Sequence, residues 1–357
     1  MHNSTIVHCI PLEIWEIIFG NACTDSGYTG HSLSQVSHLF RAASEAVKYQ
    51  SMVLQGPDHL VAFASIISRT PAHLRRVRHL YMTDEPRPKS RNTNRFLPIR
   101  SVAHKPRETD TTKLEKVMGD AVWMILEGVS FSIEILRVDF SWNIYDHDKA
   151  IFPSCPRLGS LTSDGQLLSQ NQSKRTILDK HTPLFPQLRR WHLTTQPKQQ
   201  FEGQFFSCLP DTAPNLTHLR VPGTWKPTKF LYDLRIALGM ADQRSQPGQE
   251  PITALPSNVK RVYVKPSVKP QTLAWGGGPS PYSYLIAVLR KMNDHGDGRF
   301  VLLPSYQDNE EARRPTVTEW IESIRDEEVV WGLRSRVEPK LPSSRSILQM
   351  PIVGRIL

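Results

Sequence analysis

The chain of 357 residues is 39% hydrophobic and 22% charged, and its formal net charge is +10. Its length corresponds to two or three folding units, and its apolar fraction is low for a globular chain but sufficient for a core. No apolar stretch approaches the roughly 20 residues that span a bilayer, and the first residues lack a secretory n-region and h-region, so we expect neither a membrane-spanning nor a conventionally secreted protein.

The first predicted helix covers residues 11–19. Pro11 suits the first helical position, because its φ is already helical and its missing N–H is not needed there. Apolar side chains then recur at helical spacing on one face, with a second apolar edge beside it: Leu12, Trp15, Ile18 and Phe19, with Ile14 and Ile17. Gly20 is expected to end the helix, and a polar loop at 21–31 follows.

A second helix is predicted over residues 32–43, with Ser32 and Gln35 in the spacing of a capping box. Its apolar stripe consists of Leu33, Val36, Phe40 and Ala43. A third short helix at 46–49 is expected to lead into a strand at 51–54. Three short helices of about fifty residues cannot bury this much apolar surface alone, so the surplus packs on the rest of the chain or contacts another protein.

These residues resemble the F-box, in particular the N-terminal F-box of fungal proteins. The resemblance covers residues 9–53 and rests on two motifs, Ile10-Pro11-x-Glu13-Ile14-Trp15-x-x-Ile18-Phe19 and Leu33-x-x-Val36-Ser37-x-x-Phe40-Arg41. The loop between the helices, at 20–31, is longer than is usual in the family.

The resemblance implies that the chain binds the Skp-family adaptor of a cullin–RING ubiquitin ligase. The adaptor-binding residues that it implies are Pro11, Leu12, Ile14, Trp15, Ile18, Leu33, Val36, Ser37 and Phe40. Of these, Trp15 and Phe40 are expected to pack at least partly within the module itself.

Two segments account for the positive charge of the chain. Residues 86–107 contain seven Lys or Arg and no acidic residue, and residues 334–357 contain five against one Glu. Both are rich in polar residues and lack hydrophobic periodicity, which favours a solvated insertion and tail. A nucleic-acid patch or nuclear-targeting signal is the alternative, but only Phe96 interleaves with the charges, so nucleic acid is not the favoured partner.

A short pattern recurs through the remainder of the chain: apolar, two variable, apolar, one variable, apolar. Its copies are Val77–Met82, Ile133–Val138, Leu158–Ser163, Leu188–Leu193, Leu216–Val221 and Val259–Val264, with a last strand at Arg299–Leu303. Helices are predicted between or after them, at 59–69, 112–125, 229–240, 282–292 and 316–324. The unit resembles a degenerate leucine-rich repeat, and an ordinary α/β sheet with right-handed crossovers is the alternative.

The predicted fold class is therefore α/β: a small N-terminal three-helix F-box followed by an open leucine-rich-repeat-like α/β solenoid with parallel strands. The expected divisions are 1–56 for the helical module, 57–304 for the repeat domain with a basic flexible insertion at 86–110, and 305–357 for a C-terminal helix and basic tail.

In a solenoid the variable position beside the second anchor faces the open side of the sheet. Tyr and Arg are enriched at binding hot spots, so these positions are candidates for binding a target protein; solvation of a sheet face is the alternative. They are Tyr81, Arg137, Thr162, His192, Arg220 and Tyr263.

Motifs for chemistry are not evident. The cysteines at 9, 23, 155 and 208 form no CxxC pair, which indicates a reducing compartment, the cytoplasm or nucleus, without disulfide or structural metal. The glycines at 276–278 lack the Lys-Ser/Thr of a phosphate loop, and the Asp-His-Asp run at 146–148 reads as a polar loop. We expect no catalytic residue, cofactor or metal. The predicted function is an F-box substrate receptor for an unidentified target, and the alternative is a repeat-type protein-binding scaffold without a ligase role.

Overall fold

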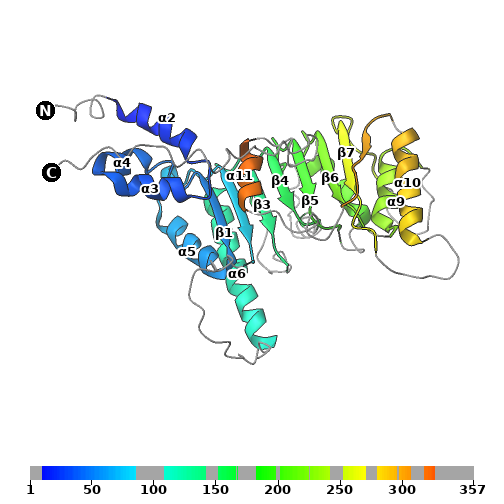
Figure 1. Cartoon of the computed structure of the whole chain (residues 1–357), viewed down its shortest axis with the longest axis horizontal. Helices are drawn as coiled ribbons and strands as arrows, with labels where there is room; N and C mark the ends of the chain where they lie inside the picture. Colours follow the sequence, from blue (N-terminus) through cyan, green and yellow to red (C-terminus); the bar gives the residue numbers. More distant parts are fainter. Residues whose placement is uncertain are drawn as a thin grey trace, which may run out of the picture.

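A single eight-stranded parallel sheet organises the chain (Figure 1). The computed structural model describes residues 10–85, 108–141, 152–165, 167, 182–197, 202–224, 226–241, 252–270, 280–295, 297–306 and 317–325. The order of the strands in space equals their order in the sequence, so each connection moves the chain one strand along. The strands are β1 (Ser51–Gln55), β2 (His79–Thr83), β3 (Ile135–Asp139), β4 (Ser160–Ser163), β5 (Arg190–Leu193), β6 (His218–Pro222), β7 (Arg261–Lys265) and β8 (Phe300–Leu302). The predicted α/β class, the strands and their parallel pairing are confirmed.

Successive strands begin with the same hydrogen bonds. In the repeats of β4 to β7, the amide of the first anchor donates to the carbonyl three residues earlier, as from Leu188 to Phe185 (3.2 Å) and from Leu216 to Ala213 (3.1 Å). The next two amides then share one carbonyl of the preceding repeat, as Arg189 and Arg190 do with Gly159. This common entry fixes the register from strand to strand, so the sequence repeat is also a structural repeat.

Asparagine side chains join two neighbouring pairs of repeats. The Asn215 amide donates to the carbonyl of Pro186 at 2.7 Å, and the Asn258 amide donates to the carbonyl of Pro214. Each Asn lies one residue before the first anchor of its repeat. Sequence analysis did not predict these bonds, because they join residues about thirty or more positions apart.

The main core lies between one face of the sheet and the helices that cover it. The first anchors, such as Val77, Leu188 and Leu216, are fully buried. Aromatic rings extend through this core from repeat to repeat, with Phe185 between Phe152 and Trp191 at centroid distances of 5.5 and 6.0 Å. The covering helices are α5 (Gly56–Arg69), α6 (Glu108–Val129), α8 (Glu202–Thr212), α9 (Lys229–Ala237) and α10 (Pro281–His295).

Helices α5 and α6 cross closely. A Cβ atom on Gly128 of α6 would lie only 2.3 Å from the side chain of Ile67 on α5. Glycine is therefore required at position 128 for this crossing. Helix α6 begins at Glu108, before the predicted start at Thr112, and α8 had not been predicted at all.

The N-terminal helices differ in their bounds from those predicted. Helix α2 (Leu12–Ala22) continues two residues beyond Gly20, which therefore does not end it. The single helix expected at 32–43 is two helices, α3 (Tyr28–Val36) and α4 (His38–Ser44). Residues 45–49 form turns rather than a third helix.

Local hydrogen bonds explain this difference. The Asp25 carboxylate accepts bonds from the amides of Gly27 and Thr29, both at 2.9 Å, and so starts α3 earlier than Ser32. Gly27 has a φ of 94°, which glycine adopts without strain. Ser37 is extended, and its hydroxyl accepts from the Phe40 amide at 3.2 Å, so it caps α4. The Ser37 cap divides the expected helix in two, and the early start of α3 at Asp25 shortens the loop before it.

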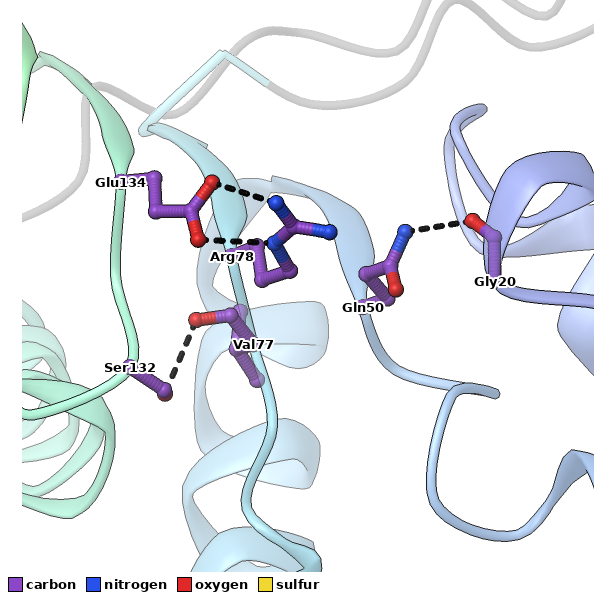
Figure 2. A network of polar contacts seen from close by, with 6 residues as sticks. All are labelled: Gly20, Gln50, Val77, Arg78, Ser132 and Glu134. Atoms are coloured by element: carbon purple, nitrogen blue, oxygen red, sulfur yellow. Dashed lines mark hydrogen bonds and ion pairs between the residues drawn. The ribbon is translucent and has the colours of Figure 1, made fainter. Parts of the chain in front are cut away.

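The helical module is joined directly to the sheet. Gln50 donates from its side chain to the carbonyl of Gly20 at 2.7 Å (Figure 2), and Ser51 donates to the carbonyl of Asp25 at 2.5 Å. Strand β1 begins at Ser51 and pairs with β2, so the first strand of the sheet falls within the segment 1–56.

The chain after β8 returns to the opposite end of the sheet. Helix α11 (Val317–Arg325) confirms the final predicted helix, and Figure 1 shows it near the β1–β3 end. Its Trp320 contacts Tyr81 of β2 with a ring-centroid distance of 5.6 Å. Tyr81 alternates with the core residues Leu80 and Met82, so α11 lies on the face opposite the covering helices.

Several predicted features fall outside the described residues. They are the basic segments at 86–107 and 334–357, the Asp-His-Asp run at 146–148, the glycines at 276–278 and Cys9. The remaining cysteines, Cys23, Cys155 and Cys208, are buried and form no disulfide with one another. Within the described ranges, no helix combines the length and apolar character that a membrane span requires.

Candidate interaction surfaces

Helix α2 has two apolar sides. Its inner side packs against α3 and α4 through Trp15 and Phe19, which form a small core with Phe40. The ring-centroid distances among these three residues are 4.9 to 5.4 Å. The prediction that Trp15 and Phe40 pack within the module is confirmed.

The outer side of α2 presents aliphatic side chains to solvent. Ile14, Ile17 and Ile18 are 45%, 61% and 44% exposed, and Leu12 at the start of the helix is 39% exposed. On α3, Tyr28 and Val36 are exposed further still, at 74% and 63%. Large apolar side chains gathered on short helices are typical of a surface that another protein covers.

The nine adaptor-binding residues implied by the resemblance are therefore divided. Trp15, Leu33 and Phe40 are partly buried and pack in the small core. The other six are exposed: Pro11, Leu12, Ile14, Ile18, Val36 and Ser37. Ser37 also caps α4. The implied list omitted Ile17 and Tyr28, although the apolar edge at Ile17 was already visible in the helical spacing.

The candidate target-binding residues form one continuous row across the sheet. The pairing register places Tyr81, Arg137, Thr162, His192, Arg220 and Tyr263 side by side, one from each of β2 to β7. Because side chains alternate along a strand, this row lies on the face opposite the helix-covered core. The pattern of the sequence thus predicted both the face and the register.

The same row is largely buried. Tyr81, Arg137, Arg220 and Tyr263 are at most 7% exposed. Trp320 of α11 contacts Tyr81, and Tyr306, which follows β8, hydrogen-bonds Arg220. Returning chain therefore covers part of the face that the sequence indicated as open.

Arg137 in this row forms an ion pair with the next residue on the same face of its strand. The Arg137 guanidinium lies 3.2 Å from the Asp139 carboxylate and 5.2 Å from the ring centre of Tyr81. Burial, with the nearby positive charges of Arg220 and Arg137, holds the pKa of His192 well below its ordinary value. The row therefore contains a neutral histidine between two arginines.

Metal chemistry has no evident place among the described residues, since no group of three or more His, Cys, Asp or Glu side chains converges there. Burial raises the pKa of the Cys155 thiol to about 12 and, with Asp25, that of Cys23 to about 11. Neither thiol has the lowered pKa of a reactive nucleophile.

No protein-family model matches the chain, and no curated protein matches it significantly.

Proposed function

We propose that the chain is a non-catalytic F-box substrate receptor, in which α2–α4 bind a Skp-family adaptor and the sheet holds a target protein for a cullin–RING ubiquitin ligase. The observation that carries the proposal is the two-sided α2. Trp15 and Phe19 satisfy the internal core, so the exposed Ile14, Ile17 and Ile18 are surplus to it.

The apolar outer side of α2 is suited to an interface with another protein. Burying apolar surface contributes about 25 cal/mol per Å², so several isoleucines covered together give a substantial gain in binding free energy. A helix that places such residues in a partner's groove is a recurrent mode of recognition. Of the nine adaptor-binding residues implied by the resemblance, six are exposed to solvent and three pack in the small core of the module.

The sheet supports the second half of the proposal. Consecutive order, parallel pairing and one shared strand entry are the properties of a leucine-rich-repeat-like solenoid, in which each unit buries its apolar face against its neighbours. Such solenoids use their extended surfaces for binding. Held beside the ubiquitin-loaded enzyme, a target's lysines would reach a high effective concentration without catalysis by this chain.

The test is a pull-down of the full-length chain with a purified fungal Skp-family adaptor. A Pro11→Ala/Ile14→Asp double variant should lose binding, because a carboxylate in an apolar contact is costly to desolvate. Ile66→Asp is the matched control, since Ile66 is also exposed, at 38%, but lies on α5. This control should bind as the parent does.

Each other result has a defined meaning. Absence of adaptor binding by the parent would contradict the ligase role and leave a repeat-type protein-binding scaffold. Equal loss in the double variant and in Ile66→Asp would show that the effect is not specific to α2. A reconstituted ligase that modifies proteins co-purifying with the parent, but not with the double variant, would support the complete proposal.

A further inference from the structure

A basic groove lies along the edge where the strands begin. It has a volume of about 1250 Å³, and strands β3 to β7 and the turns before them line it. The repeats of β4, β5 and β6 each supply the same three positions, and those of β3 and β7 supply two of them, because these strands enter the sheet in the same register. Side chains at equivalent positions of neighbouring repeats therefore lie about 4.8 Å apart along the groove.

Cations occupy four of these positions. The lining includes Arg157, Arg189, Arg190 and Lys260, and Arg261 follows Lys260 on β7. The side chains of Arg157, Arg189 and Lys260 are exposed, and none makes a hydrogen bond or ion pair within the described part of the chain. They are therefore available to an incoming anion.

The acidic residue that lines the groove is already neutralised. Glu134 accepts two bonds from the Arg78 guanidinium, at 2.8 and 2.9 Å (Figure 2). Among the described lining residues Glu134 is the only acid, so the net charge of the groove is positive. Burial and the positive charges of Arg190, Lys260 and Arg261 lower the pKa of His218 at the centre of the groove, which is consistent with this potential.

The rest of the lining is mixed, with the apolar Ile135 beside polar side chains. Asn215, Thr217 and Asn258 donate to backbone carbonyls of the chain itself, whereas the Gln187 amide has no hydrogen bond to another described residue and can meet a peptide backbone. The described lining residues include no Phe, Tyr or Trp on which a base could stack, and stacking is the usual contribution of proteins that bind single-stranded nucleic acid. These features favour a peptide over a nucleic acid.

We propose that this groove binds an extended acidic segment of the target protein. Three strand spacings separate β4 from β7, which is about 14 Å, and an extended segment of about four to five residues covers that distance. Carboxylates on its alternate residues would meet Arg157, Arg189 and Lys260 in succession. The inference rests on the proposed function only in identifying the bound protein as the target. It places the target-binding site at the edge of the sheet rather than on the buried row of Tyr81 to Tyr263.

The test is fluorescence anisotropy of the full-length chain at low salt with a labelled eight-residue peptide of alternating Glu and Ser. Binding should weaken steeply as salt is added, because the contacts are ionic. An Arg189→Glu/Lys260→Glu variant should bind at least about tenfold more weakly, since two charge-assisted contacts become repulsive. Both side chains are exposed, so folding should be retained.

Arg69→Glu/Arg290→Glu is the matched control. It makes the same change in net charge at exposed positions on α5 and α10, away from the groove, and should bind the peptide as the parent does. If both variants bind the peptide equally weakly, the effect comes from the net charge of the protein rather than from the groove, and the proposal is wrong. Absence of peptide binding by the parent would overturn it as well.

A labelled single-stranded oligonucleotide is the competing probe. If it binds at least tenfold more tightly than the peptide and is equally sensitive to Arg189→Glu/Lys260→Glu, the groove is a nucleic-acid site and the proposal is wrong. The adaptor pull-down is independent of these variants. Peptide binding without adaptor binding would therefore refute the ligase role alone, and the reverse would refute the groove alone.

Discussion

The N-terminal helices and the sheet differ in how far they bury the same types of apolar residue. Leu, Ile and Val at the anchors of each repeat are buried almost completely, whereas on α2 and α3 the same residue types, apart from Leu33, are about two-fifths to three-fifths exposed. In a repeat, each strand gains two neighbours and a covering helix, so its apolar side chains are buried within the chain. The helical module has only a four-residue buried core with a few partly buried side chains around it. The apolar side chains that this small core cannot bury stay exposed, where a partner protein could cover them.

Replacing Trp191 should give the largest effect on stability. Its side chain is fully buried between Phe185 and Phe205, and its Nε1 donates to the Ser163 hydroxyl at 3.0 Å. Trp191→Ala should lower the free energy of unfolding by about 3–5 kcal/mol, because it opens a large cavity in the core. Urea denaturation followed by far-UV circular dichroism measures this change.

The matched change in the helical module is Ile17→Ala. It should alter the free energy of unfolding by less than about 0.5 kcal/mol, since the side chain is already exposed. A loss comparable to that of Trp191→Ala would mean that α2 is packed by the chain itself and would remove the difference between the two regions.

Acidification should destabilise the sheet through His79 at the start of β2. Burial, with the nearby charge of Arg78, lowers the pKa of His79 to about 4, against about 6.5 in an unfolded chain. Between these values the unfolded state binds a proton that the folded state does not, so stability is complete above about pH 6.5 and falls towards pH 4. The total loss of unfolding free energy from this group, complete below about pH 4, is about 3 kcal/mol.

The measurement is the free energy of unfolding of the parent and of His79→Leu between pH 7.5 and 4.5. The variant should lose less stability on acidification, because leucine takes up no proton. The substitution breaks no bond at the buried Nδ1 of His79, which has no hydrogen-bond partner among the described residues. His59→Leu, at an exposed position on α5, is the control. Identical pH dependence in the parent and His79→Leu would contradict this assignment.

Loss of the cap at Ser37 should have an intermediate effect. Ser37→Ala removes the hydroxyl that accepts from the Phe40 amide and should cost about 1 kcal/mol of helix stability. The change should appear as faster amide hydrogen exchange in α4. A Ser34→Ala control, at a residue whose hydroxyl bonds within α3, should leave exchange in α4 unchanged.

A mainly local effect should come from Trp320 on α11. Trp320→Ala should change the overall free energy of unfolding by less than about 1 kcal/mol, because a peripheral helix can detach locally. Hydrogen exchange should nevertheless increase in α11 itself and in β2, where Tyr81 loses its contact. Exchange that rises uniformly across the sheet would show instead that α11 is part of the main cooperative unit.

The predictability of the fold differs between its parts for a physical reason. A period of two assigns Tyr81, Arg137 and their equivalents to one face, and the repeated anchors set the strand register, so both followed from the pattern. The split between α3 and α4 did not follow from the pattern. Ser32 was the expected cap of one long helix, but Asp25 and Ser37 cap two shorter ones, and the sequence does not show which of several neighbouring Ser and Asp residues acts as a cap. The apolar edge at Ile14 and Ile17 was visible, but not its exposure.

The sequence by itself determined the α/β class, the parallel strands and the face on which each side chain lies, since these depend on local periodicity, whereas the order of the strands in the sheet came from the structure. Only the tertiary structure decided which surfaces are accessible. Returning chain covers Tyr81 and Arg220, and shared strand entries bring Arg157, Arg189 and Lys260 together from separate repeats. Such contacts join residues tens to hundreds of positions apart, and packing between distant segments leaves no periodic signal in the chain.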